Sequence, residues 1–157
     1  MLMRKLFLTL LLFISIVACD DAYKSSIPDV SFYFSCSLVQ ADYIIIQSYG
    51  QFKKVKVNVN RIPVGYAGLL IGQFNDFGNY RYIAFDAACP VEASRSTSLD
   101  LSEDMRVAIC PTCRTKYDLE SGGYPVEGEG KEALKRYNVT VNGSTCLLYT
   151  SPSPRDR

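Results

Sequence analysis

Short runs of β-branched and aromatic residues alternate with turn residues along most of the chain. In the clearest run, residues 54–59, valine alternates with lysine and asparagine with a period of two, as in a strand with one buried face. Stretches rich in glycine, asparagine, aspartate and serine separate the runs. Several short strands at this spacing predict an all-β sandwich or barrel. The other predicted strands are residues 30–34, 43–46, 68–71, 80–85, 106–109 and 137–141.

The N-terminal end breaks this pattern. Two basic residues precede the apolar run 6–18, which is typical of a secretory signal and is shorter than the roughly twenty residues that span a bilayer. The run ends in I-V-A-C and resembles the bacterial lipobox. That resemblance implies cleavage before Cys19 and a diacylglycerol on its thiol. We therefore expect a lipoprotein signal peptide at 1–18 and a polar, lipid-anchored tether at 19–29.

The C-terminal end breaks the pattern in a different way. Residues 146–156, C-L-L-Y-T-S-P-S-P-R-D, match codon for codon a translation of a common transposase sequencing adapter. The proline-rich end of this segment cannot continue the apolar alternation before it. We expect 146–157 to be an artefact of sequencing with no structural role, which leaves 30–145 as the domain. We also expect the natural gene to continue differently after Ser144.

Composition narrows the function classes. The chain has 157 residues, of which 48% are hydrophobic and 21% charged, as in an ordinary single globular domain. It contains no histidine, which excludes Ser-His-Asp and Cys-His catalysis and any histidine metal site. The net charge is +1 and no basic block is present, so nucleic acid is not an expected partner. We expect a protein that is not an enzyme by itself.

Three cysteines stand in loops that follow predicted strands. Cys89 lies in A-A-C-P-V-E, and Cys110 and Cys113 lie in C-P-T-C. A C-P-x-C loop forms a tight turn in which two sulfurs converge. The second Cys-Pro loop can supply the rest of a metal shell, or the same thiols can form a disulfide in an oxidising compartment. Cys36 is expected to be a small buried apolar residue.

These loops resemble those of the Rieske-type iron–sulfur domain. Residues 110–118 read C-P-T-C-R-T-K-Y-D beside the family's C-P-C-H-G-S-x-Y-D, and 89–91 read C-P-V beside C-x-H. Residues 119–137 are similar to its Gly-Pro loop and closing strand. The likeness covers roughly 64–141 and is greater to envelope lipoproteins whose Rieske-like loops carry C-P-x-E and C-x-x-C. It implies a Rieske-like β-sandwich or barrel with a cysteine-loop subdomain at about 86–126.

The departures from that family decide the cofactor chemistry. A Rieske centre needs two histidines on one iron. Val91 and Cys113 stand at the two histidine positions, so the standard histidine-ligated [2Fe–2S] cluster is excluded. Three thiolates remain, and Glu92 is the nearest side chain that can complete a set of four ligands. Asp86 is a weaker candidate for that position.

Three interpretations of the site stay open. The three cysteines, with a carboxylate or water, can hold zinc, or they can hold a variant [2Fe–2S] cluster. Alternatively, the fold has lost its cluster, two of the cysteines form a disulfide, and the domain is a binding or interaction module. In each case we expect a bacterial cell-envelope protein, lipid-anchored to the membrane through Cys19 on the periplasmic or surface side. A filled site predicts electron transfer or metal carriage with another envelope protein as partner.

Overall fold

The computed structural model describes residues 25–76 and 78–150, and within them the chain is built from antiparallel strands. One 3-10 helix, η2 (Ile44–Gln47), is present, and these residues form no α-helix. The predicted all-β class is confirmed. In chain order the strands are β1 (Tyr33–Ser37), β2 (Phe52–Val55), β3 (Leu69–Asp76), β4 (Asn79–Asp86), β5 (Asp100–Leu101), β6 (Val107–Ile109), β7 (Lys116–Asp118), β8 (Tyr124–Glu127), β9 (Arg136–Tyr137), β10 (Thr140–Asn142) and β11 (Thr145–Tyr149).

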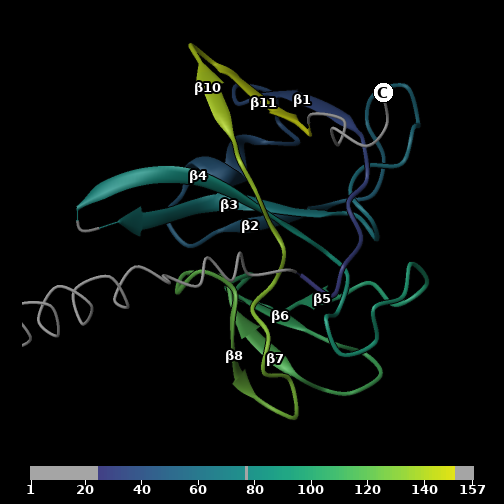
Figure 1. The fold of residues 1–157 in the computed structure, drawn as a ribbon. Coiled ribbons are helices and arrows are strands. Elements are labelled where there is room, and N and C mark those ends of the chain that lie inside the picture. Colours follow the sequence, from purple (N-terminus) through teal and green to yellow (C-terminus); the bar gives the residue numbers. More distant parts are fainter. Residues whose placement is uncertain (1–24, 77, 151–157) are drawn as a thin grey trace, which may run out of the picture.

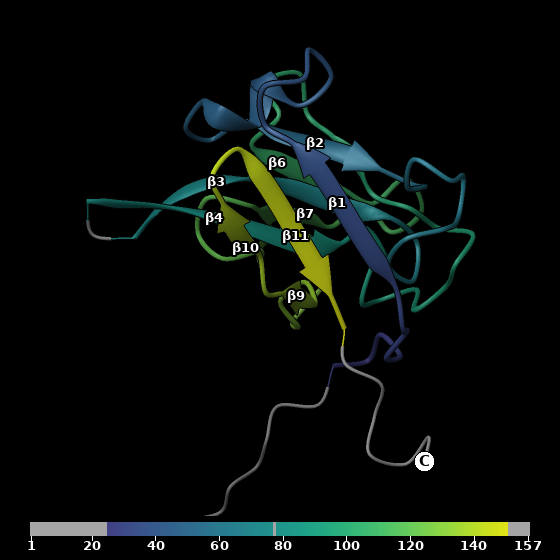
Figure 2. The same cartoon turned by 90° about the horizontal axis from the view of Figure 1, so that it is seen from above.

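The strands form three sheets that stack as layers (Figure 1). The middle layer has the strand order β2-β3-β4-β9. Its two longest strands, β3 and β4, pair with each other as a hairpin. Strands β1, β11 and β10 cover one face of it, with β1 and β11 side by side (Figure 2). The sheet β5-β6-β7-β8 lies against the other face and carries the cysteine loop between β6 and β7.

Two hydrophobic cores lie on opposite faces of the middle sheet, because successive side chains of a strand point to opposite sides. Leu69 and Ile71 belong to the core shared with β1 and β11. Leu70, between them, belongs to the core shared with the cysteine-bearing sheet. Phe85 packs into that second core and its neighbour Ala84 into the first. A strand buried on both faces therefore has a continuous apolar sequence.

Two predicted strands are wrong in part. Residues 43–46 form a turn and η2, because the N–H groups of Tyr43 and Ile46 bond carbonyls three residues back and only Ile46 is buried. The run 54–59 leaves the sheet after Val55. Asn58 accepts the N–H groups of Asn60 and Ile62 through its side-chain oxygen, and this local turn ends the strand. The valines beyond Val55 alternate in sequence but remain exposed.

The expectation that residues from Cys146 onward have no structural role is wrong for residues 146–149, and residues 151–157 lie outside the described part. Strand β11 is the central strand of its sheet and pairs with β1 over five residues, from Ser37↔Thr145 to Tyr33↔Tyr149. Cys146 and Leu148 are completely buried. The reason is chemical: T-C-L-L-Y alternates buried and exposed positions as a strand does, and the break comes only at the following proline-rich residues.

Candidate metal centre

The two cysteine loops meet beneath the middle sheet. Cys89 follows β4, and Cys110 and Cys113 lie between β6 and β7. The three Sγ atoms all lie within 4.8 Å of one another, and those of Cys89 and Cys113 are 3.6 Å apart. Cys89 and Cys110 are fully buried, whereas Cys113 is partly exposed. The expectation that loops twenty residues apart in sequence converge is confirmed.

The two loops close by the same backbone turn. The carbonyl of Cys89 accepts the N–H of Ala93 at 2.8 Å, and that of Cys110 accepts the N–H of Arg114 at 3.1 Å. The residue four positions after the cysteine has a positive φ in both loops, 45° at Ala93 and 62° at Arg114. Such angles are uncommon for residues other than glycine. In both loops this turn reverses the chain direction just after the cysteine.

Hydroxyl groups surround the sulfurs. The Cys113 thiol donates to Oγ1 of Thr115 at 3.2 Å, and the Tyr117 hydroxyl lies 3.6 Å from the Cys89 sulfur. Thr115 is itself held in place, because it accepts the N–H of Gly130 and because a Cβ on Gly128 would lie 2.7 Å from its Cα. Only glycine allows the chain after β8 to pack this closely against the site.

The thiols differ in acidity. Burial raises the pKa of the Cys110 thiol to about 11. Burial is also the largest influence at Cys113, but the Thr115 hydroxyl and backbone N–H, which can donate to the thiolate, and the neighbouring thiols together lower the pKa of Cys113 below its usual value. Burial and the bond to Cys89 raise the pKa of Tyr117, which keeps its hydroxyl neutral. The partly exposed Cys113 is therefore more readily ionised than Cys110.

The structure separates the two carboxylates considered as a fourth ligand from the cysteine group. Glu92 is half-buried in the first loop and does not belong to the cluster of ligand atoms. Val91, at the position of a Rieske histidine, is 41% exposed and offers no ligand atom. Asp86 is fully buried, and its carboxylate faces the backbone of other loops.

Asp86 organises the entry to the first cysteine loop. Its carboxylate accepts the N–H groups of Tyr66, Ala67 and Ala88 and the hydroxyl of Tyr137. Burial, followed by the nearby Asp86 carboxylate, raises the pKa of Tyr137, so that this hydroxyl remains a donor. The ligand hypothesis missed this structural role. An aspartate ending an apolar strand, directly before A-A-C, was the available signal of a buried polar anchor.

Comparisons with known proteins leave the family open. No family model matches the chain, and no curated protein matches it at a significant level. A ferredoxin of Sphingomonas yanoikuyae B1 is similar at 16% identity, over 68% of this chain and 93% of that one, with a TM-score of 0.40. The ferredoxin of carbazole 1,9a-dioxygenase from Nocardioides aromaticivorans IC177 is similar at 14% identity, over 78% and 100%, with a TM-score of 0.43.

A third solved structure is a complex of reduced oxygenase and oxidized ferredoxin in carbazole 1,9a-dioxygenase, with 17% identity, coverage of 72% and 96%, and a TM-score of 0.41. Likenesses of this size carry no conclusion about family or function. The all-β fold rests on the strand pairings of the chain itself, and the metal centre on its three sulfurs.

Proposed function

We propose that the chain is a lipid-anchored protein of the bacterial cell envelope whose Rieske-like domain binds one zinc ion and carries it. The ligands are Cys89, Cys110 and Cys113. The observation that supports this proposal is the convergence of the three sulfurs, within 4.8 Å of one another, from two separate loops. The sequence supports the anchor through the apolar run that ends at Cys19, which lies outside the described residues.

All three sulfurs lie within 4.8 Å of one another, which fits a single ion better than the two separate irons of a cluster. A tetrahedral zinc about 2.3 Å from each thiolate holds two sulfurs roughly 3.8 Å apart. The separation of 3.6 Å between the sulfurs of Cys89 and Cys113 matches this value. The histidine-ligated cluster of the Rieske family does not fit, because Val91 has no ligand atom and Cys113 brings a third thiolate into the same small space.

The side chains around the sulfurs prepare the site for a cation. Cys113 is partly exposed and the pKa of its thiol is lowered, so it is the first thiolate available from solvent. The pKa of Cys110 is about 11, so its proton must leave as the ion binds, and uptake should release protons. Zinc held by three thiolates keeps a fourth position for water or for a ligand from a partner. Carriage requires such an open position.

A metal assay on the full chain tests this proposal. The protein is purified anaerobically in a non-ionic detergent, and its metal content and visible spectrum are measured. We expect about one zinc per chain with no visible charge-transfer band. Cys110→Ser should lose the zinc. The matched control Cys36→Ser changes another buried cysteine, which lies in the opposite core, and should retain it.

Two other results would replace the proposal with the alternatives that the sequence left open. Iron with visible charge-transfer bands would identify a variant [2Fe–2S] cluster and favour electron transfer. Metal-free protein in which two of the three thiols react with iodoacetamide only after mild reduction would identify the disulfide form. That result would favour a binding module that has kept the fold without its cofactor.

A further inference from the structure

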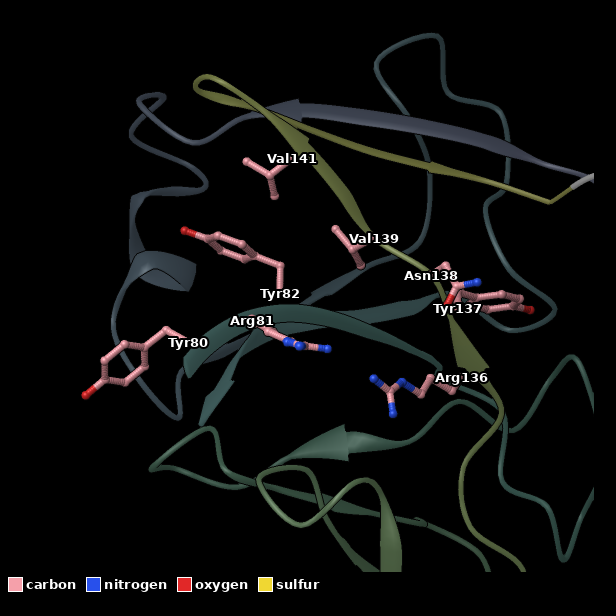
Figure 3. Close-up of a pocket in the computed structure, with 8 residues that line it drawn as sticks. All are labelled: Tyr80, Arg81, Tyr82, Arg136, Tyr137, Asn138, Val139 and Val141. Carbon is pink, nitrogen blue, oxygen red and sulfur yellow. The ribbon is translucent and has the colours of Figure 1, made fainter. Parts of the chain in front are cut away.

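A groove lies at the β4–β9 edge of the middle sheet, and no cysteine lines it. Its volume is about 510 Å³, and its walls come from β4, β9, β10 and the link between β9 and β10 (Figure 3). Two arginines, three tyrosines, two valines and an asparagine line it, and none of the eight lining residues is acidic. The metal-site proposal uses none of these residues.

The groove runs along an open strand edge. Strand β9 pairs with β4 only at Ala84 and Phe85, although β4 begins at Asn79. After Tyr137 the chain turns into β10, which belongs to another sheet. Along 79–83, the edge of β4 that faces away from β3 therefore has no strand partner among the residues that the structure describes.

Main-chain groups of two tyrosines face this open edge. The N–H of Asp86 donates to Lys135 on the β9 side at 2.8 Å. Because alternate residues of an antiparallel strand direct their main-chain groups to the same side, those of Tyr80 and Tyr82 also point away from β3. An exposed edge of this kind is a template for an added strand.

The two faces of β4 at this edge carry different side chains. Figure 3 shows Tyr82, Val139 and Val141 on one side of β4 and the guanidinium groups of Arg81 and Arg136 toward the other. A strand added at this edge would point alternate side chains to the two sides. Its residues on the arginine side should be acidic, and those on the valine side apolar.

We propose that this groove binds an extended segment of a partner protein in which acidic and apolar residues alternate, added as a strand to the edge of β4. The main-chain groups of Tyr80 and Tyr82 give the strand its hydrogen bonds, and Arg81 and Arg136 pair with its carboxylates. The apolar side chains pack against Tyr82, Val139 and Val141. The guanidinium of Arg136 is already positioned, 5.6 Å from the ring centre of Phe74.

Fluorescence anisotropy on the full chain in detergent tests the proposal with a labelled, end-blocked hexapeptide of alternating glutamate and valine. We expect saturable binding that weakens with salt, and no binding of the matching lysine–valine peptide. Replacing both arginines by Arg81→Gln and Arg136→Gln should weaken binding at least tenfold. Arg61→Gln, on an exposed loop outside the groove, should not change it.

A proline separates main-chain pairing from simple charge attraction. Tyr80→Pro removes an N–H that faces the open edge, where proline is tolerated, whereas Tyr80→Ala keeps it. We expect the proline variant to bind at least tenfold more weakly than the alanine variant, with the same thermal midpoint by circular dichroism. Equal binding by the two, displacement of the peptide by succinate at millimolar concentration, or no binding to the unchanged protein would overturn the proposal.

Discussion

The carboxylate of Asp86 joins three segments that are far apart in the sequence. It takes backbone N–H groups from the turn before β3 and from the loop that leads to Cys89, and a hydroxyl from β9. The N–H of Ala88 and the Tyr137 hydroxyl are buried, so both need this acceptor. One residue thereby fixes the start of the first cysteine loop against the middle sheet.

Replacing this carboxylate should be costly. In Asp86→Ala, the buried N–H of Ala88, two half-buried N–H groups and the buried Tyr137 hydroxyl lose their acceptor, and we expect the free energy of unfolding to fall by at least about 3 kcal/mol. Urea unfolding followed by circular dichroism measures the change. Asp100→Asn, which removes an exposed partner of Lys54, is the matched control and should unfold near the parent midpoint. Equal midpoints for the two variants would contradict this role of Asp86.

At the scale of elements, the sheet β1-β11-β10 depends on its central strand β11. Strands β1 and β10 both pair with β11 and not with each other. Phe34 of β1, which lies opposite Leu148 in the register, belongs with it to the first core. Without β11 the two outer strands would have no partner, and the core would open to water.

A chain that ends at Thr145 should therefore be much less stable than one that ends at Thr150. The shorter chain loses the buried side chains of Cys146 and Leu148 and the pairing of β11 with its neighbours. We expect its free energy of unfolding to be lower by at least about 3 kcal/mol. Thermal unfolding of both truncated proteins measures the difference. The longer chain lacks only residues outside the described range and should melt like the parent. Matching melting curves for the two would show that β11 contributes nothing.

The origin of these residues is a separate matter that concerns the gene. We propose that 146–157 is encoded by a sequencing adapter, because its sequence matches a translated adapter codon for codon. Resequencing the source locus should show a different continuation after about Thr145. Because β1 and β10 need a common partner, that continuation should again encode a strand with alternating apolar residues. A genomic sequence identical to the proline-rich tail would contradict the adapter origin.

At the scale of the whole molecule, the layers separate two surfaces. The cysteine centre lies between the middle sheet and the sheet β5-β6-β7-β8. The arginine-lined groove lies at the edge of the middle sheet. The chain enters the described part at Ser25, whose hydroxyl donates to Glu132. No helix in the described part is both long and apolar enough to cross a membrane. We propose, from the lipobox-like run that ends at Cys19, that this residue attaches the protein to a membrane.

Changing the proposed lipidation site should release the protein. We expect Cys19→Ser to give a soluble or uncleaved form, because the thiol that would carry the diacylglycerol is gone. Fractionation of cells expressing the full chain, with the precursor and mature forms resolved by mass spectrometry, measures the outcome. Cys36→Ser is the matched cysteine control and should stay with the membrane fraction. Unchanged processing and membrane association of Cys19→Ser would disprove the anchor.

The sequence by itself determined the all-β class and located part of β3, at 68–71, and most of β4, at 80–85. Alternation and turn residues are local signals, whereas the meeting of the two cysteine loops was expected from the resemblance to the Rieske-type domain. It also excluded a histidine-ligated cluster, because Val91 cannot bind a metal.

Only the tertiary structure decided which face each residue occupies and which distant groups meet. The valines after Val55 alternate like a strand, yet no sheet covers them, and they stay exposed. Asp86 is an anchor because three separate segments bring donors to it, and Cys146 is buried because its face of the β1-β11-β10 sheet packs against the middle sheet. Burial and pairing depend on contacts between residues distant in sequence, which no local pattern contains.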